Sequence, residues 1–214
     1  MLTMCWAAKG GSGTTVVSCA LALLTAESRQ PTILVDMAGD VPAALGLPEP
    51  PGPGIHDWVL SPSAPVQSFI SLGSLGADGL MLVPRGAGVA AGDLARWHDL
   101  GRFLAESTTE FIVDAGSGPP PPALAAAAQH RLLVIRPCYL ALRRAAASTL
   151  SPTGVIVVHE PGRALRAQDV AYAVQAPVVA EVSTDPAVAR AVDAGLLAAR
   201  LPRTLAASLR VLVA

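Results

Sequence analysis

Charged and aromatic side chains are scarce in this sequence. Asp, Glu, Lys and Arg make up 14% of the 214 residues, the formal net charge is −1, and Phe, Trp and Tyr make up 4%. So little net charge predicts no strong general attraction to nucleic acid or to acidic membranes. Most arginines lie in the second half of the chain, but acidic residues are interspersed among them without an aromatic stacking platform. We interpret them as a solvated surface rather than a nucleic-acid interface.

Cysteine is also rare. Cys5, Cys19 and Cys138 lie far apart, without the C-x-x-C spacing that indicates a metal site. Cys5 and Cys19 occupy apolar segments, which favours buried free thiols in a reducing cytoplasm. No apolar run is long enough to span a bilayer, and the first residues lack the basic region and cleavage site of a signal peptide. We therefore expect a soluble, cytoplasmic protein without an integral membrane segment.

Apolar residues make up 52% of the sequence, enough for a sizeable core, and the length predicts one domain, residues 1–214. Short strand-like runs alternate with helical patterns, which predicts an α/β fold with a mostly parallel, doubly wound sheet flanked by helices. The predicted strands are Leu2–Ala7, Thr32–Asp36, Leu80–Pro84, Phe111–Asp114, Leu132–Arg136, Val155–His159 and Val178–Val182. The predicted helices are Thr15–Glu27, Asp93–Glu106, Ala123–Gln129, Leu140–Ser148, Ala167–Val174, Pro186–Leu197 and Leu205–Val213. Proline predicts surface loops at Pro48–Pro53 and Pro119–Pro122.

The stretch between the first predicted strand and the first predicted helix is rich in glycine. It reads Lys9-Gly10-Gly11-Ser12-Gly13-Thr14-Thr15. Glycines allow backbone N–H groups to turn toward a phosphate, and the following helix N-terminus adds the positive end of its dipole. Lys9 is the only lysine in the chain, and its compact ammonium suits a phosphate as a point charge. The alternative is a glycine turn that joins strand to helix without binding a ligand.

The segment KGGSGTT resembles KGG-x-G-K-[ST], the deviant Walker A loop of the ParA/MinD-type ATPases. The resemblance implies a P-loop fold in which Gly10, Gly11, Ser12, Gly13, Thr14 and Thr15 hold ATP or ADP, with Mg²⁺ at Thr15. It also implies that Lys9 reaches the phosphates of a partner subunit. One position departs from the family: the usual P-loop lysine, which reaches the β- and γ-phosphates, falls at Thr14.

Two further strand ends carry carboxylates, and ligands bind at the carboxyl ends of such strands. Asp114 ends the run Phe111–Asp114 and is followed by Gly118. The pair resembles the family's Walker B aspartate, which holds the Mg²⁺ water shell, and the D-x-x-x-G glycine, whose N–H senses the γ-phosphate. Alternatively, Asp114 caps the helix that follows. Asp36 resembles the first aspartate of the family's D-x-D.

The second aspartate of that D-x-D motif falls at Ala38, which cannot orient an attacking water. Asp40 lies two residues after Ala38, and this shift changes the direction of its side chain. We therefore do not count Asp40 as a replacement for the missing aspartate. Family members commonly read adenine with an asparagine, and this sequence contains none. His159 or backbone groups around Val182–Pro186 are the remaining candidates for base recognition.

The resemblance implies spatial positioning or partitioning of a cellular cargo (chromosome, division site, or pilus or secretion machinery) through ATP-dependent homodimerisation and a protein partner or cargo adaptor. Some relatives bind DNA non-specifically, which the charge pattern here does not favour. Thr14 and Ala38 imply weak or absent ATP hydrolysis, so the chain is at most a slow ATPase. The alternative is a pseudo-ATPase scaffold that no longer binds nucleotide. An ATP-dependent ligating enzyme is not supported, because the sequence shows no separate group of substrate-binding residues. A tyrosine kinase is not supported either, because Tyr139 and Tyr172 are the only tyrosines.

Overall fold

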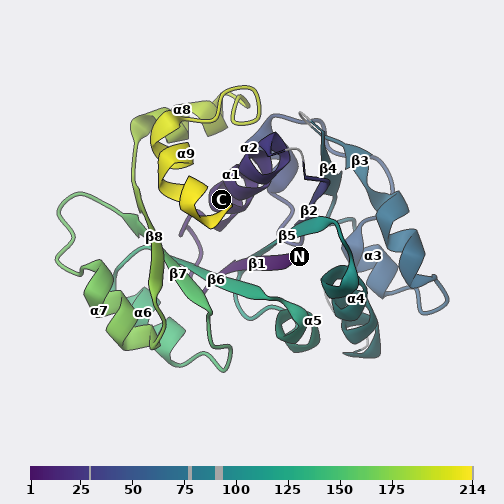
Figure 1. Cartoon of the computed structure of the whole chain (residues 1–214), viewed down its shortest axis with the longest axis horizontal. Coiled ribbons are helices and arrows are strands. Elements are labelled where there is room, and N and C mark those ends of the chain that lie inside the picture. The colour runs from purple at the N-terminus through teal and green to yellow at the C-terminus, as the bar shows by residue number, and fades with distance from the viewer. Residues whose placement is uncertain (29, 77–78, 90–93, 214) are drawn as a thin grey trace.

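The computed structural model describes the chain except for residues 29, 77–78, 90–93 and 214 (Figure 1). The described residues form an eight-stranded sheet in the order β3-β4-β2-β5-β1-β6-β7-β8. Neighbouring strands are parallel, apart from the antiparallel pair of β3 and β4 at one edge. The strands are β1 (Leu2–Ala7), β2 (Thr32–Asp36), β3 (Ser74–Leu75), β4 (Leu80–Val83), β5 (Glu110–Ser117), β6 (His130–Ile135), β7 (Gly154–His159) and β8 (Val178–Ser183).

Helices cover both faces of the sheet. The α-helices are α1 (Thr14–Glu27), α2 (Val41–Leu45), α3 (Ile55–Val59), α4 (Leu94–Glu106), α5 (Pro122–Ala127), α6 (Tyr139–Ala146), α7 (Ala167–Val174), α8 (Pro186–Asp193) and α9 (Arg203–Leu209). Two 3₁₀ helices, η1 (Val66–Leu72) and η2 (Arg210–Leu212), complete the set. Figure 1 shows α1, α2, α8 and α9 on one face and α3 to α7 on the other. The predicted doubly wound α/β fold is confirmed.

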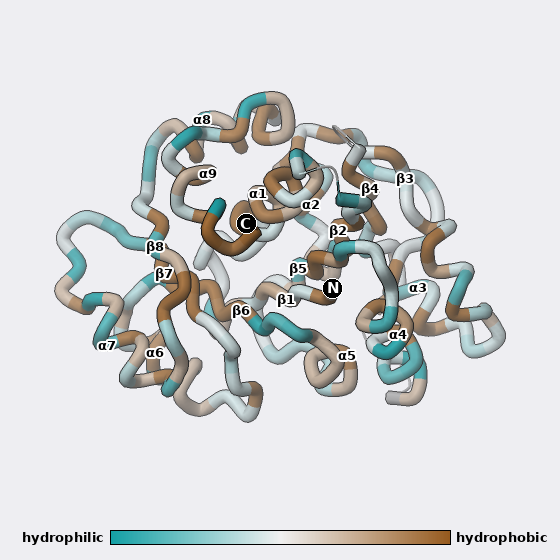
Figure 2. The backbone as a smooth tube through the Cα atoms, viewed as in Figure 1, coloured by the Kyte–Doolittle hydropathy of each residue, from teal (hydrophilic) through white to brown (hydrophobic). Residues whose placement is uncertain are grey.

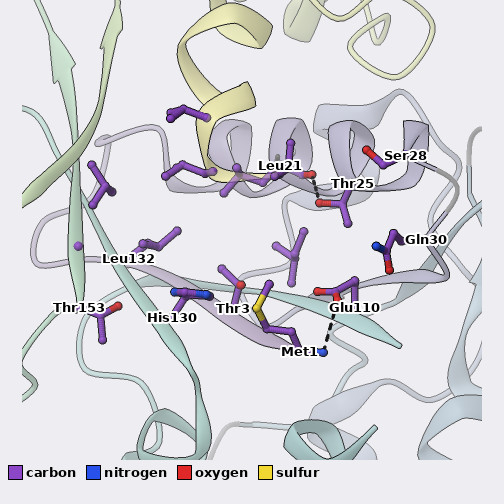
Figure 3. A pocket seen from close by; sticks show the side chains of 16 residues that line it. Met1, Thr3, Leu21, Thr25, Ser28, Gln30, Glu110, His130, Leu132 and Thr153 are labelled. Atoms are coloured by element: carbon purple, nitrogen blue, oxygen red, sulfur yellow. Dashed lines mark hydrogen bonds and ion pairs between the residues drawn. The ribbon is translucent and has the colours of Figure 1, made fainter. Parts of the chain in front are cut away.

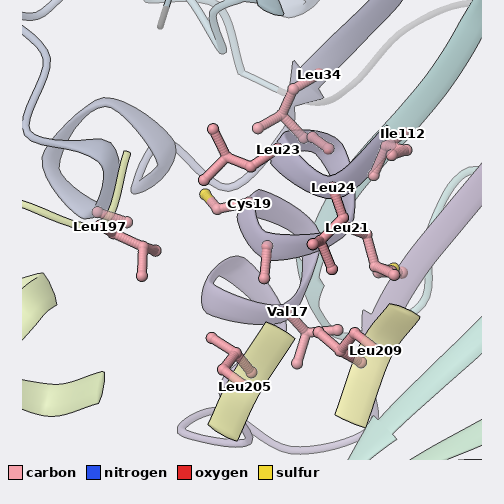
Figure 4. Packing of buried hydrophobic residues seen from close by; sticks show 14 of the residues in the cluster. Val17, Cys19, Leu21, Leu23, Leu24, Leu34, Ile112, Leu197, Leu205 and Leu209 are labelled. Carbon is pink, nitrogen blue, oxygen red and sulfur yellow. The ribbon is translucent and has the colours of Figure 1, made fainter. Parts of the chain in front are cut away.

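The helix α1 is the centre of one face. Its residues Val17 to Leu24 are all buried, so it is apolar around most of its circumference, as expected of a helix enclosed by other elements. Figure 4 shows Val17, Leu21 and Leu24 packed among side chains of the sheet and of α9. The strands β1 and β2 are buried along their whole length, because both faces of the sheet are covered. Figure 2 shows hydrophobic residues concentrated in these inner elements.

The seven predicted strands are all present; β1 and β2 have the predicted bounds, and the ends of the other five differ by a few residues. One difference matters for the site: β5 does not end at Asp114 but continues to Ser117. This extension follows from a register shift against β1, where Cys5 pairs with Asp114 but Ala7 pairs with Ser117.

Several predicted helix ends were wrong. The helix from Pro186 ends at Asp193, because Gly195 adopts a left-handed φ of +63° and its N–H bonds to the Val192 carbonyl. The helix predicted over Leu205–Val213 begins earlier and becomes 3₁₀ after Leu209. Pro122 is not in a loop but opens α5, where proline is tolerated because the first turn needs no N–H donor.

Other boundaries shifted by one or two residues, and the start predicted at Asp93 lies outside the described residues. The sequence analysis missed α2, α3, η1 and β3, all of which lie between Asp40 and Leu80. Helices of five residues and a strand of two carry too little periodicity to stand out among prolines and glycines. Within the described ranges, no helix combines the length and apolar character that a bilayer crossing requires.

Candidate functional site

A pocket of about 560 Å³ lies at the carboxyl ends of the central strands. Four chain segments and one helix meet there: the glycine loop after β1, the loop after β2, the loop after β4, the end of β5, and α3. Its lining consists of Gly10, Gly11, Ser12, Gly13, Thr14, Thr15, Val16, Met37, Ala38, Asp40, His56, Arg85, Ala115, Gly116 and Ser117. Six of the seven residues expected to bind the nucleotide, Gly10 to Thr15, line this one pocket, and the seventh, Gly118, does not.

The glycine loop has the backbone shape that its composition predicts. Gly11 and Gly13 adopt left-handed φ angles of +76° and +87°, which other residues rarely adopt. A Cβ at either position would meet no atom within 4 Å, so open space lies beside the backbone there. The Ser12 hydroxyl donates to the Lys9 carbonyl at 2.8 Å and closes the loop. The α1 N-terminus follows directly, with the Val17 N–H bonded to the Gly13 carbonyl at 3.0 Å.

Lys9 does not line the pocket. Its Nζ donates to the neighbouring Gly10 carbonyl at 3.4 Å, so the ammonium lies along its own loop. Thr14, in contrast, lines the pocket with only 7% of its surface exposed. The position at which the family pattern places a lysine is therefore occupied by a buried hydroxyl group.

Asp114 has no exposed surface and does not itself line the pocket, although the next residues of β5, Ala115 to Ser117, do. Its Oδ1 accepts the Gly116 N–H at 3.1 Å, whereas Oδ2 has no hydrogen-bond partner among the described residues. Burial raises the pKa of this carboxyl, the Thr15 hydroxyl and Gly116 N–H oppose that rise, and the charge of Asp40 adds to it. A buried carboxylate oxygen without a partner is rare, and a hydrated cation beside Thr15 would satisfy it. The residues present thus fit Mg²⁺.

Asp36 is placed differently. It ends β2 as predicted and is fully buried, but it does not line the pocket. Its carboxylate accepts three backbone N–H groups of the following loop, from Ala38 at 2.9 Å, Gly39 at 2.6 Å and Val41 at 3.1 Å. Burial raises its pKa to about 6, and those hydrogen bonds oppose the rise. In this structure Asp36 organises the loop that carries Ala38 into the pocket.

Gly118 also lies outside the pocket lining. Its N–H donates to the Ala7 carbonyl at 2.9 Å, because β5 continues past Asp114 and pairs with the end of β1. Gly116, with a φ of +65°, and Ser117 line the pocket instead. A Cβ added at Gly116 would approach the Ala38 Cβ to 2.9 Å, so the loop after β2 lies directly against the end of β5.

Three charged or titratable residues of the lining were missed or set aside in the sequence analysis. Asp40, which was not counted as a replacement for the missing aspartate, does line the pocket. Arg85 follows the strand β4, and its position at a strand's carboxyl end is a signal that a sequence reading can use. His56 lies in the short helix α3, which the sequence analysis did not predict, and no sequence signal singled it out.

The residues considered for base recognition form hydrogen bonds with other residues of the same chain. The His159 ring is hydrogen-bonded to the Glu181 carboxylate, and the Thr184 N–H bonds to the His159 carbonyl. The Asp185 side chain caps α8 through the Ala187 N–H and accepts the Thr204 hydroxyl. These contacts leave base recognition a prediction.

A second cavity of about 570 Å³ lies at the opposite, amino ends of the strands, below the end of α1 (Figure 3). Figure 3 shows Met1 paired with Glu110 and the Thr25 hydroxyl bonded to the Leu21 carbonyl. The cavity has no glycine loop and no helix N-terminus among its lining residues. The chemistry therefore points to the pocket at the carboxyl ends, although the two volumes are nearly equal.

Comparisons with known proteins agree with this layout. No family model and no curated protein sequence matches the chain. Among solved structures, a ParA family ATPase from Chlorobium tepidum TLS matches with a TM-score of 0.78 and 16% identity, covering 97% of this chain and 96% of that one. The fold is that of the ParA and MinD ATPases.

Two MinD structures extend the comparison. The septum site-determining protein MinD of Pyrococcus horikoshii OT3, complexed with Mg-ADP, has a TM-score of 0.75 and 18% identity and covers 100% of this chain and 95% of that one. The MinC:MinD cell division protein complex of Aquifex aeolicus matches with a TM-score of 0.77 and 18% identity. The match covers 99% of this chain and 93% of that one. At these identities the likeness establishes the ParA/MinD fold, and the chemistry of this chain has to be argued from its own residues.

Proposed function

We propose that this chain is an atypical ParA/MinD-type protein that binds ATP or ADP with Mg²⁺, dimerises when ATP is bound, and positions or partitions a cellular cargo. The observation that carries the proposal is the pocket in which the glycine loop, the α1 N-terminus and the Asp114 region meet on a ParA/MinD fold. The Mg-ADP in the P. horikoshii MinD structure supports the ligand. The MinC:MinD complex supports a protein partner or cargo adaptor.

In this proposal each residue of the site has a stated role. The N–H groups from Gly10 to Thr15 bind phosphate oxygens, and the positive end of the α1 dipole reinforces them. Thr15 and Asp114 hold Mg²⁺, which when bound neutralises phosphate charge. Lys9, which lies along its loop and outside the pocket lining, contacts a partner subunit. Asp36 holds the β2 loop in shape. The protein acts in the cytoplasm, as one domain.

The second candidate is a pseudo-ATPase scaffold that does not bind nucleotide. Thr14 favours it, because a buried hydroxyl replaces the P-loop lysine. Calorimetry with ATP and ADP in the presence of Mg²⁺, combined with light scattering, separates the two. Binding accompanied by a doubling of mass supports the positioning protein, and absence of binding supports the scaffold.

Lys9→Ala is expected to weaken ATP-dependent dimerisation about tenfold or more, because a lost charge-assisted contact to phosphate is worth about 1.5–3 kcal/mol. The fold should be unaffected, since the hydrogen bond that Nζ makes with the described residues goes to the carbonyl of its neighbour Gly10. Light scattering across a concentration series measures the effect. Arg102→Ala, an exposed change on α4 across the sheet, is the matched control. Equal dimerisation of Lys9→Ala and wild type would contradict the proposal that Lys9 contacts the phosphates bound to a partner subunit.

Asp114→Asn is expected to abolish the strengthening of ATP binding by Mg²⁺, because the unpartnered Oδ2 becomes an amide that cannot hold a cation's water shell. We expect a Mg²⁺ effect of about tenfold in wild type and none in the variant. Titration of ATP into each protein, once in the presence of Mg²⁺ and once in the presence of a chelator, measures the Mg²⁺ effect in wild type and in the variant. Asp193→Asn, an exposed change at the end of α8, should behave as wild type. An undiminished Mg²⁺ effect in Asp114→Asn would contradict the metal assignment.

A further inference from the structure

We propose that Arg85, at the end of β4, binds the terminal phosphates of the nucleotide and supplies the positive charge that the glycine loop lacks at Thr14. The inference rests on the proposed function, since it concerns the same pocket. It adds a binding residue from a different strand, outside the loop motif. Arg85 and Thr14 line the same 560 Å³ pocket.

The backbone around Arg85 is held firmly by α3. The Ile55 N–H donates to the Pro84 carbonyl at 2.9 Å, and the His56 N–H donates to the Arg85 carbonyl at 3.1 Å. The Asp57 carboxylate accepts the Gly54 N–H at 2.8 Å and the Ala87 N–H at 3.1 Å. Bonds on both sides of Arg85 therefore fix the segment from which its side chain extends.

Two glycines show how closely these segments approach. A Cβ at Gly54 would lie 2.2 Å from the Pro84 carbonyl oxygen and from the Gly86 nitrogen. A Cβ at Gly86, whose φ is +77°, would lie 1.9 Å from an Asp57 carboxylate oxygen. Only glycine fits at these positions, so the loop after β4 is fastened against α3 by direct backbone contact.

The Arg85 side chain extends over the loop after β2. Its Cδ would lie 3.1 Å from a Cβ at Gly39, so the aliphatic stem crosses that glycine closely. The side chain is half-buried, and its guanidinium has no hydrogen bond or ion pair with any described residue. Its nitrogens are not among the buried unpaired atoms, so the guanidinium reaches water and can exchange that water for a phosphate, which offers the bidentate partner that its planar fork prefers.

His56 gives a second and independent indication of a ligand. It is 2% exposed, lines the same pocket, and neither ring nitrogen has a hydrogen-bond partner among the described residues. Burial lowers the pKa of the ring and the charge of Arg85 lowers it further, whereas the Met37 backbone beside the ring and the charge of Asp57 oppose that shift; the Met37 contact does not meet the geometry of a full hydrogen bond. Buried polar atoms are nearly always paired in folded proteins. A phosphate group or its bound water would pair them here.

The remaining charges of the pocket are compatible with this role. Asp40 is the one carboxylate in the lining, and it is exposed and forms no ion pair with Arg85 within the described part of the chain. Lys9 does not line the pocket. Arg85 is accordingly the residue of the lining that carries a permanent positive charge, and it comes from the loop after β4 rather than from the glycine loop.

The test is calorimetric titration of Mg-ATP into wild type, Arg85→Gln, Arg85→Lys and the matched control Arg102→Gln. We expect Arg85→Gln to bind ATP at least about tenfold more weakly, Arg85→Lys to recover part of the loss, and Arg102→Gln to match wild type. Adding Thr14→Lys to Arg85→Gln should restore binding, because the lysine returns a positive charge to the same pocket. Unfolding curves without nucleotide show whether each variant is folded.

The outcomes separate the inference from the function on which it rests. Wild-type binding that is unchanged in Arg85→Gln overturns the role of Arg85 and leaves the nucleotide function intact. No binding by wild type overturns both. If Arg85→Gln does not fold, the double variant Arg85→Lys with Thr14→Lys is compared with Arg85→Lys alone. Tighter ATP binding by the double variant supports the proposal that Arg85 supplies the charge missing at Thr14. Equal binding by the two variants contradicts it.

Discussion

Replacing Thr14 by lysine and Ala38 by aspartate together is expected to raise ATP turnover on the order of 10³-fold over a very slow wild type. Phosphoryl transfer is accelerated mainly by positioning and by neutralising charge on the transferred group. Thr14 lines the pocket but offers only a hydroxyl, and Ala38 has no group that could orient a water. Arg85 enters from the loop after β4, so it favours phosphate binding without occupying the lysine position next to α1.

The measurement is release of inorganic phosphate by wild type, both single variants and the double variant. Thr25→Lys is the matched control, because it adds the same charge to the same helix at the cavity on the opposite edge of the sheet (Figure 3). We expect no change from it. Rapid turnover by wild type that neither change affects would show that the loop is aligned wrongly with the family pattern.

Asp36→Ala is expected to lower the free energy of unfolding by about 3 kcal/mol near pH 4, because three buried N–H groups lose their acceptor. The difference in the free energy of unfolding between wild type and Asp36→Ala should become smaller as the pH rises. The pKa of Asp36 is about 6 in the folded protein against 3.8 unfolded, so the folded state binds the proton more tightly. Stability from this group is therefore complete below the unfolded pKa and is lost as the pH rises through about 6.

Urea unfolding of wild type and Asp36→Ala at several pH values tests this prediction. Asp40→Ala is the control in the same loop, since the exposed Asp40 side chain makes no capping bond to α2, and its effect should stay within about 0.5 kcal/mol. A gap that widens as the pH rises would mean that the charged form of Asp36 is favoured by folding. No gap at any pH would mean that the loop does not depend on the carboxylate.

The fold was predictable because its strands are apolar runs of the right length. Thr32–Asp36 and Leu2–Ala7 are buried on both sides, so each stands out in the sequence and ends where predicted. The glycine loop was predictable as well, since it follows such a run directly. Short elements between Asp40 and Leu80 were not, because tertiary contacts rather than periodicity hold them in place.

The directions of the site's polar groups were less predictable. The Asp36 carboxylate turns to backbone N–H groups, and the Gly118 N–H is bonded to Ala7 through the register shift of β5. Arg85 depends on contacts with a segment about thirty residues earlier in the chain, such as the bond from Ala87 to Asp57. Such contacts follow from packing between distant segments, and the local pattern around each residue does not encode them.

The burial of α1 has a consequence for the thermodynamics of ligand binding. This helix is enclosed by the sheet, α2 and α9, so its N-terminal N–H groups are already ordered before any phosphate arrives. Little conformational entropy is then lost at the glycine loop on binding, because the cradle is pre-organised. The backbones of the loops after β2 and β4 are also fixed by hydrogen bonds, so the ordering cost falls mainly on the side chains that these loops carry into the pocket, such as that of Arg85. Sequence changes in those loops can therefore tune affinity while the helix stays the same.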